Sequence, residues 1–221
     1  MSVLDRIIAS IAPFDCVGCG AEGRLLCHIC SAKILVPDAV CFRCLKPMTD
    51  NQTCDDCAQA TNLAALRQAS TYSDAAKALV WRLKFTGARR AADEMALCLA
   101  AVNRPQRGVY IVPVPTATSR VRQRGYDQAA LLAQAYAKRT GNTYLACLAR
   151  LGHMQQRGAS RSARLQQLGG QYRITNRRLL QGARVLLVDD VATTGATLQA
   201  AAETLHSAGV INIEAIVFAR A

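Results

Sequence analysis

Two adjacent carboxylates near the C-terminal end of the sequence follow directly on an apolar run. Residues 185–188, Val-Leu-Leu-Val, lead into Asp189 and Asp190. A buried strand does not tolerate charge unless a partner compensates it, and the carboxyl end of a parallel strand opens into the ligand crevice of an α/β sheet. Vicinal sugar hydroxyls suit such a pair of acids, which can also orient a Mg²⁺ ion. We therefore predict a sugar site at the end of this strand.

The segment after the two acids has the composition of a phosphate loop. It is small and hydroxylated and leads straight into a helical pattern; its residues are Ala192, Thr193, Thr194, Gly195, Ala196 and Thr197. Backbone N–H groups at a helix start form an anion site that the helix dipole reinforces. Gly195 allows the backbone to approach the anion closely. Together with the acids, this loop predicts a site for a phosphorylated ribose.

Eight of the ten cysteines form four CxxC pairs within residues 16–57. The pairs are Cys16/Cys19, Cys27/Cys30, Cys41/Cys44 and Cys54/Cys57. A CxxC turn presents two thiolates to one ion, so four turns supply two closed, structural Zn²⁺ sites. Sequential pairing of the turns is favoured because each hairpin then closes locally, and an interleaved arrangement stays open. The remaining Cys98 and Cys147 lie in apolar stretches and are expected to be inert core thiols.

The rest of the chain alternates between helical and strand patterns. Helices are expected at 74–85, 91–102, 127–139 and 196–207, and strands at 109–114, 144–149, 183–189 and 212–218. This alternation predicts an α/β fold with a mostly parallel sheet covered by helices on both faces. We interpret 58–70 as a connector and 152–170 as a long loop. The predicted domains are 1–60, with an N-terminal helix and the double zinc ribbon, and 61–221.

Two basic segments are candidates for the pyrophosphate half of a ligand. Pro115 and Thr116 follow the strand at 109–114, and a run with Arg120, Arg122 and Arg124 comes next. Basic side chains near a strand's carboxyl end can neutralise the charge on a departing pyrophosphate, although a solvated basic loop is the alternative. The loop at 156–164, which ends at Arg164, is a candidate lid over the pyrophosphate or a track for a nucleic-acid backbone.

The acids and the phosphate loop together resemble the signature of type I phosphoribosyltransferases. On this resemblance Asp189 and Asp190 hold the ribose hydroxyls, residues 192–197 hold the 5′-phosphate, and the ligand is phosphoribosyl pyrophosphate with Mg²⁺. The resemblance also implies the type I phosphoribosyltransferase fold.

Nearly the whole chain from Cys16 onward resembles the ComF (competence protein F) family, which joins an N-terminal zinc ribbon to such a domain. The likeness covers the CxxC pairs, the stretch from Tyr72 to Lys84 and Phe85, the Pro-Val-Pro turn, RxRGYDQA at 122–129, QxGxSRxxR at 156–164 and VDDVATTG. The family usually has Phe-Asn where this chain has Tyr126 and Asp127, and Asn where it has Gln167. The resemblance implies a role in natural transformation, in which the protein handles single-stranded DNA with a competence helicase or another DNA-processing protein.

Charge and hydropathy set the remaining expectations. The 27 Lys and Arg against 15 Asp and Glu give a net charge of +12, which attracts polyanions such as nucleic acid. No run reaches the roughly 18 apolar residues of a membrane span, and the first residues make a poor signal peptide, so a cytoplasmic protein is expected. Two functions stay open: a phosphoribosyltransferase with an unidentified acceptor, and a non-catalytic nucleotide sensor or DNA-binding adaptor with the same fold.

Overall fold

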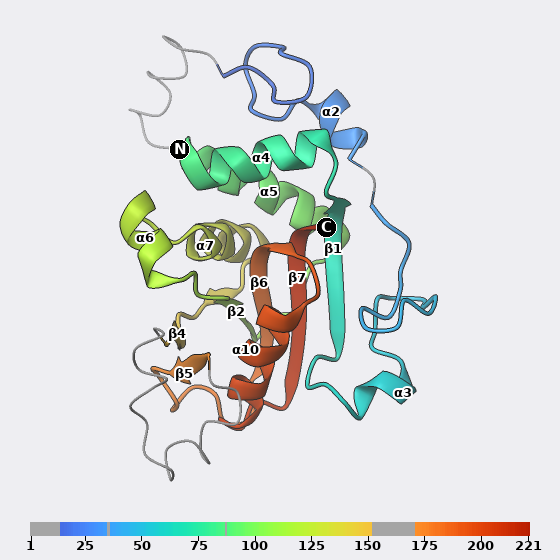
Figure 1. Cartoon of the computed structure of the whole chain (residues 1–221), viewed down its shortest axis with the longest axis vertical. Helices are drawn as coiled ribbons and strands as arrows, with labels where there is room; N and C mark the ends of the chain where they lie inside the picture. The colour runs from blue at the N-terminus through green and yellow to red at the C-terminus, as the bar shows by residue number, and fades with distance from the viewer. Residues whose placement is uncertain (1–13, 35, 87, 152–170) are drawn as a thin grey trace.

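The structure is a computed structural model that describes residues 14–34, 36–86, 88–151 and 171–221. The expected N-terminal helix and the candidate lid at 156–164, with Arg164, lie outside these residues. Within them, five parallel strands form the central sheet in the order β1-β7-β6-β2-β3 (Figure 1). The strands are β1 (Ala65–Thr71), β2 (Val109–Pro113), β3 (Thr143–Tyr144), β6 (Arg184–Ala192) and β7 (Asn212–Arg220). The predicted α/β fold with a parallel sheet is confirmed.

Helices cover both faces of this sheet. Three helices pack together on one face: α4 (Asp74–Phe85), α5 (Ala88–Val102) and α7 (Gln128–Thr140). Helix α10 (Ala196–His206) lies on the other face against β6 and β7, as Figure 1 shows. The side chains of β6 alternate accordingly, with Leu186 in the core under the three helices and Leu187 in the core under α10. This period of two explains why the apolar run at 185–188 is buried throughout.

Several of the sequence interpretations need correction. Residues 65–71, expected as part of a connector, form the edge strand β1, which pairs with β7. The sequence ALRQAST lacks the apolar pattern of a buried strand. Its polar Arg67 and Gln68 are tolerated because they remain only partly buried at the edge of the sheet. Strand β6, expected to end at Asp189, continues to Ala192 because β7 still pairs with it there.

The basic segment after β2 contains a helix that the sequence did not predict. A solvated loop is the alternative given for this segment, but Thr118–Arg124 form the short helix α6, which ends at Gly125 with a φ of 79°. Arg120 and Arg122 are exposed on this helix. The segment lacks apolar residues at helical spacing, so its pattern gave no helical signal.

A small hairpin stands apart from the main sheet. Strand β4 (Leu148–Arg150) pairs antiparallel with β5 (Tyr172–Ile174). The single strand expected at 144–149 is therefore two strands, β3 in the main sheet and β4 in this hairpin. The intervening Cys147 is fully buried between them, as expected of a core thiol, and burial raises its pKa to about 11.

The four CxxC turns form two separate modules at different places on the sheet. The first ribbon, residues 14–34, contains the short helix α2 (His28–Ala32) and lies against α4 and α5. The second ribbon, residues 39–60, contains α3 (Asp55–Ala58) and lies beside β1 (Figure 1). The backbone N–H of its Thr53 donates to the carbonyl of Ala64, and the N–H of Leu66 on β1 donates to the carbonyl of its Asn51. The second ribbon thus extends the edge of the sheet.

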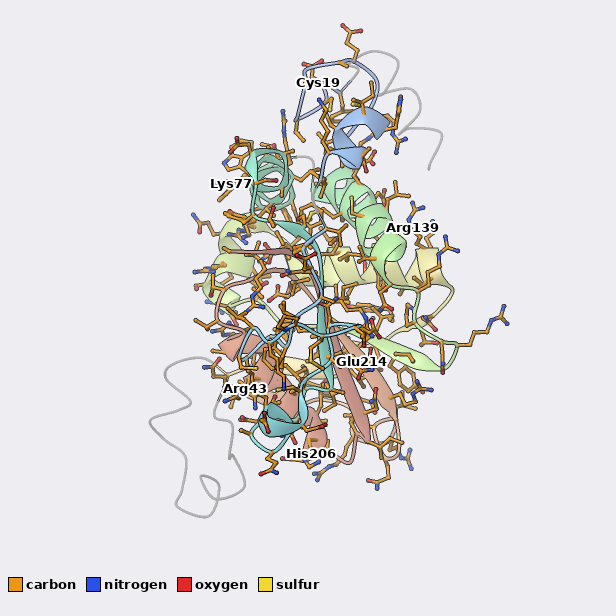
Figure 2. All side chains as sticks on the ribbon, turned by 90° about the vertical axis from the view of Figure 1, so that its right-hand side faces the viewer. Cys19, Arg43, Lys77, Arg139, His206 and Glu214 are labelled. Carbon is orange, nitrogen blue, oxygen red and sulfur yellow. The ribbon has the colours of Figure 1, made fainter. Side chains whose placement is uncertain are left out.

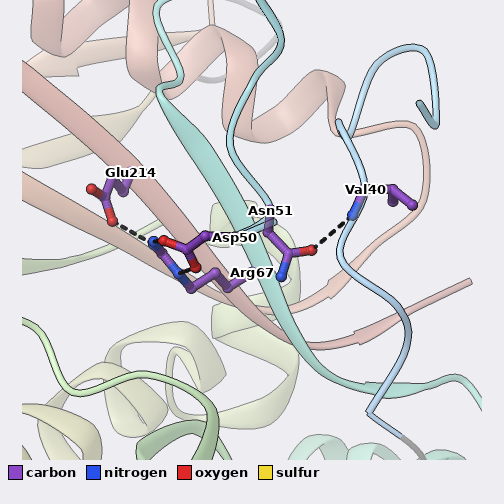
Figure 3. A network of polar contacts seen from close by, with 5 residues as sticks. All are labelled: Val40, Asp50, Asn51, Arg67 and Glu214. Atoms are coloured by element: carbon purple, nitrogen blue, oxygen red, sulfur yellow. Dashed lines mark hydrogen bonds and ion pairs between the residues drawn. The ribbon is translucent and has the colours of Figure 1, made fainter. Parts of the chain in front are cut away.

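A polar network ties the second ribbon to two strands. Arg67 on β1 forms ion pairs with Asp50 of the ribbon, at 2.8 Å, and with Glu214 on β7 (Figure 3). The Asn51 side chain accepts a hydrogen bond from the backbone N–H of Val40, 3.3 Å away, which closes the ribbon on itself. The Arg67 side chain is only 13% exposed, so these contacts are more strongly held than ordinary surface pairs.

Across the part of the chain that the structure describes, none of the helices has both the length and the hydropathy that a bilayer crossing requires.

Candidate functional site

Asp189 and Asp190 lie on the part of β6 that extends beyond its neighbour β2. The last residue pair between these strands is Pro113 with Val188, whereas β7 continues to pair with β6 as far as Ala192. The backbone N–H of Asp190 donates to the Asp189 carboxylate at 2.8 Å. Desolvation and the neighbouring charge of Asp190 raise the pKa of Asp189 well above its usual range. Sugar hydroxyls or a cation bound here would stabilise the charged form of Asp189 and offset this repulsion.

Lys84, at the end of α4, forms an ion pair with Asp190. Its Nζ lies 2.7 Å from Oδ2 of Asp190, in a geometry outside that of a hydrogen bond. The Asp190 side chain is 6% exposed, so this ammonium compensates a carboxylate that would otherwise be buried without a partner. The sequence analysis names Lys84 only within the stretch of family likeness and gives it no role in the site, because a lysine in the last turn of a helix is expected anyway from the helix dipole.

The small residues after the acids form the turn into α10. Gly195 is the N-cap of this helix with a φ of 77°, a left-handed conformation that favours glycine. The backbone N–H of Ala196 donates to the Thr194 hydroxyl at 3.3 Å. The first N–H groups of α10 therefore lie just after the two acids, as an anion site requires. The expected arrangement of acids, loop and helix start along one continuous segment is what the structure has.

The loop after β2 is held by Asp127. The carboxylate of Asp127 accepts hydrogen bonds from the backbone N–H and the hydroxyl of Thr116, both at 3.0 Å. The same carboxylate caps α7 by accepting from the N–H groups of Ala129 and Ala130. Its negative charge, which the sequence placed near a pyrophosphate site, is thus shared among four donors. The family's usual asparagine has one acceptor oxygen fewer and could not form all four bonds.

Arg124 reaches the last turn of α4 from the end of α6. Its guanidinium lies 5.3 Å from the centroid of the Phe85 ring and donates to Gln128 at 2.7 Å. Tyr126 donates its hydroxyl to the backbone carbonyl of Leu83 at 2.8 Å. The last turn of α4 therefore contacts both the predicted ribose acids, through Lys84, and the predicted pyrophosphate segment, through Phe85 and Leu83.

Within the described residues, two groups of four cysteines could each hold a metal ion. The groups are Cys16, Cys19, Cys27 and Cys30, and Cys41, Cys44, Cys54 and Cys57. The sulfur atoms of each group lie within 4.8 Å of one another, with Cys19 and Cys27 at 3.7 Å and Cys44 and Cys54 at 3.6 Å. A tetrahedral ion with metal–sulfur distances of about 2.3 Å needs sulfurs roughly 3.8 Å apart. The donor sets fit such an ion, and the sequential pairing of the turns is confirmed.

One thiol in each group is prepared to bind as a thiolate. Desolvation opposes the charge on Cys16, but hydrogen bonds from backbone groups, including Cys27, lower its pKa to about 6. Backbone hydrogen bonds from Cys44 and Cys54 likewise lower the pKa of Cys41 to about 6 against desolvation. Thiolates are the metal-binding form of cysteine, so both modules are metal-binding cysteine clusters.

The second ribbon forms a wall next to the phosphate loop. A hollow of about 420 Å³ lies between Phe42, Arg43 and Leu45 of the ribbon and the loop residues 194–196. A Cβ atom on Gly195 would lie 3.7 Å from the Phe42 ring, and Arg220 donates to the Phe42 carbonyl at 2.8 Å. Thr61 and Gln199 join the end of the ribbon to α10 by a further hydrogen bond. No local pattern indicates this contact, because its partners are about 150 residues apart in the sequence.

The chain is similar to known proteins over most of its length. Residues 132–221 match the phosphoribosyl transferase domain model. The competence protein ComFC of Bacillus subtilis (strain 168) is 27% identical over 195 residues, which cover 83% of this chain and 79% of that protein. The competence protein F of Haemophilus influenzae (strain ATCC 51907 / DSM 11121 / KW20 / Rd) is 35% identical over 124 residues, half of each chain.

Two solved structures show a more distant likeness. The allosteric regulatory enzyme of purine biosynthesis is 21% identical over 58% of this chain and 25% of its own, with a TM-score of 0.43. Glutamine phosphoribosylpyrophosphate amidotransferase from B. subtilis, complexed with ADP and GMP, is 22% identical over 58% of this chain and 26% of its own, with a TM-score of 0.44. Likenesses this distant add nothing to the assignment.

The parallel sheet with its acid pair and phosphate loop, together with the domain match, defines a protein with a phosphoribosyltransferase domain. The similarity to two competence proteins and the presence of two clusters of four cysteines point to a smaller group within this class of proteins. The chain is similar to competence proteins of the ComF family, and it also carries two groups of four cysteines.

Proposed function

We propose that the segment from Asp189 to Thr197 binds phosphoribosyl pyrophosphate together with Mg²⁺. The observation that carries this proposal is the order of groups along one strand–loop–helix unit. Two carboxylates extend past the neighbouring strand, and a left-handed glycine then opens the N-terminus of α10. The carboxylates suit the ribose hydroxyls, and the small loop of residues 192–197 suits the 5′-phosphate.

The pyrophosphate half of the ligand is assigned to the segment that follows β2. Thr116, which Asp127 holds in place, and Pro115 lie in the loop at the carboxyl end of that strand. Arg124 and Lys84 contribute positive charge near the last turn of α4. When bound, Mg²⁺ supplies charge neutralisation on the pyrophosphate oxygens. Arg164 belongs to the same proposal but lies outside the described residues.

The metal in both cysteine clusters is proposed to be Zn²⁺ in a structural role. Four sulfur donors leave no open position for a substrate, which is typical of structural zinc sites. We also propose the division of the chain into a double-ribbon unit, residues 1–60, and a phosphoribosyltransferase-like unit, residues 61–221. Reduced metal-binding thiolates are typical of the cytoplasm, which is the proposed location.

At the level of the cell, we propose a role in natural transformation, in which the protein handles single-stranded DNA with a helicase or another DNA-processing partner. The named relatives are competence proteins, and the net charge of +12 favours a polyanionic ligand. The affinity for an oligonucleotide should therefore fall steeply with salt concentration. An oligonucleotide affinity that does not change with salt concentration would mean that the positive charge does not serve DNA binding.

The ligand proposal is tested by calorimetric titration of phosphoribosyl pyrophosphate with Mg²⁺. The wild type should bind, and Asp189→Asn/Asp190→Asn should release no measurable heat, because the ribose loses both charged acceptors. Exposed Asp93→Asn on α5 is a control that removes a carboxylate elsewhere. Unchanged affinity in the double variant would contradict the assignment.

Turnover is a separate question, which pyrophosphate release measures. A phosphoribosyltransferase releases pyrophosphate when its acceptor is present, so release with a nucleobase or an oligonucleotide would identify an enzyme. Binding without release under every acceptor tested would support a nucleotide sensor or DNA-binding adaptor instead.

A further inference from the structure

Two large aromatic rings are exposed on α4, close to the proposed ligand site. Trp81 and Phe85 are 52% and 56% exposed, and their ring centroids lie 5.7 Å apart at an angle of 43°. Trp81 is the single tryptophan of the sequence. A groove of about 360 Å³ runs beside them, lined by Tyr72, Lys77, Val80, Lys84 and both rings. Exposed apolar rings beside a groove are typical of a site where another molecule binds and covers them.

The groove is surrounded by cations. Lys77 Nζ lies 5.6 Å from the centroid of the Tyr72 ring, and the Arg82 guanidinium lies 6.0 Å from the Trp81 ring. Arg124 covers Phe85 from the side of α6. None of the described residues that line the groove is acidic. Aromatic faces bordered by Lys and Arg are complementary to a ligand that is both aromatic and negatively charged, whereas an apolar protein surface would leave these charges without partners.

The groove also leads to the proposed ribose site. Lys84 lines the groove and at the same time forms the ion pair with Asp190. Phe85, the last residue of α4, contacts Arg124 of the predicted pyrophosphate segment. A ligand in the groove would therefore contact Lys84, the residue that forms the ion pair with Asp190.

We propose that this groove, the α4 groove, binds single-stranded nucleic acid, with one base stacked on Trp81 and Phe85 and the phosphates next to Lys77 and Arg82. This inference rests on the proposed handling of single-stranded DNA and assigns it a surface. Stacking on an aromatic face is tolerant of base identity because every base has a π-face. The groove accordingly binds strands without sequence preference.

Tryptophan fluorescence tests the proposal directly, because Trp81 is the sole indole in the chain. The probe is an oligothymidylate of about 12 nucleotides, within the site sizes usual for such grooves. Titration should quench the Trp81 emission, whereas a strand of the same length without bases should bind through its phosphates and leave the emission unchanged. Equal quenching by both strands, or quenching by neither, would overturn the stacking.

Variants separate the groove from general electrostatics. Trp81→Leu should weaken oligothymidylate binding about tenfold or more in fluorescence anisotropy, as loss of a stacked base predicts. Lys77→Gln should weaken it a few-fold and reduce the salt slope by about one. Arg139→Gln is the matched control, since it removes one exposed charge from α7, on another side of the molecule (Figure 2). Equal effects of Lys77→Gln and Arg139→Gln, or unchanged binding by Trp81→Leu, would contradict the proposal.

The two binding proposals fail independently. Trp81→Leu should keep its affinity for phosphoribosyl pyrophosphate, because the ring does not contact the acids or the phosphate loop. Asp189→Asn/Asp190→Asn should lose that affinity and still show oligothymidylate quenching. If the acid variant also abolished quenching, the α4 groove would not be a separate nucleic-acid surface.

Discussion

The two cysteine ribbons have the same four-sulfur chemistry but lie at different places: the first packs against α4 and α5, and the second lies along the sheet edge beside β1. Cys16 and Cys30 of the first ribbon, with Leu25 and Leu26, are buried in the core that α4, α5 and α7 share. This ribbon is so tightly packed that a Cβ atom on Gly18 would lie 2.8 Å from the sulfur of Cys30. The first ribbon therefore acts as a part of the core.

The second ribbon contributes Phe42 to the core on the α10 face. That ring lies next to Gly195, and the carbonyl of Phe42 accepts from Arg220 at the end of β7. The second ribbon therefore packs against the loop that is proposed to hold the ligand phosphate. The two cysteine clusters thus differ in what they contact: the first is part of the core, and the second also lies against the proposed ligand site.

The largest expected contrast comes from removing each metal separately. Cys41→Ser/Cys44→Ser and Cys16→Ser/Cys19→Ser should each lower the metal content from two ions per chain to one. Only the second-ribbon variant should also lose about 1.4 kcal/mol or more of phosphoribosyl pyrophosphate binding, roughly tenfold in affinity. Metal analysis and calorimetry on the folded variants measure both quantities.

Equal losses of affinity in the two cysteine variants would remove the proposed difference between the ribbons. A metal content below one ion in either variant would show that the two sites do not bind independently.

A second contrast keeps both metals and removes one core side chain from each ribbon. Phe42→Ala and Leu26→Ala should each cost about 3 kcal/mol of unfolding free energy, as truncation of a buried side chain does. Phe42→Ala should weaken phosphoribosyl pyrophosphate binding in addition, because the turn at Gly195 loses the ring against which it packs. Urea unfolding and calorimetry test this; a weaker ligand affinity in Leu26→Ala would be the contrary result.

The smallest contrast concerns the ion pairs that join each ribbon to the main domain. Arg67→Met should cost about 1–2 kcal/mol, since it leaves Glu214 and Asp50 without their shared, mostly buried cation. Arg24→Met removes a pair with Glu94 in which the arginine is 54% exposed, and it should cost about 0.5 kcal/mol or less. Similar losses of unfolding free energy for Arg67→Met and Arg24→Met in urea would mean that burial of the arginine does not determine the strength of these ion pairs.

Local patterns were enough to predict the parallel sheet, the strand–turn–helix unit that carries the two acids, and the sequential cysteine groups. In each case the signal lies within a short segment, such as the apolar run before Asp189 or a CxxC turn. Asp127 was expected near a helix start, and it is the N-cap of α7. Each of these features depends on residues that are close together in the sequence, so the sequence alone is enough to predict it.

The features that escaped prediction depend on contacts between distant segments. Strand β1 is polar and exists because β7 and the second ribbon pair with it on its two sides. Lys84 is separated from Asp190 by more than 100 residues, and Phe42 from Gly195 by about 150. Nothing in the residue types at these positions indicates their partners, because any lysine or phenylalanine could fulfil many packing roles.

Hydrogen exchange measured by mass spectrometry tests most directly whether the unit from Asp189 to Thr197 is the ligand site. Adding phosphoribosyl pyrophosphate and Mg²⁺ should slow exchange in peptides that span residues 190–199, because bound phosphate accepts hydrogen bonds from the amides at the start of α10. Peptides of the first ribbon, which packs against α4 and α5, should be unchanged. Protection elsewhere with none at residues 190–199 would contradict the assignment of this loop as the phosphate site.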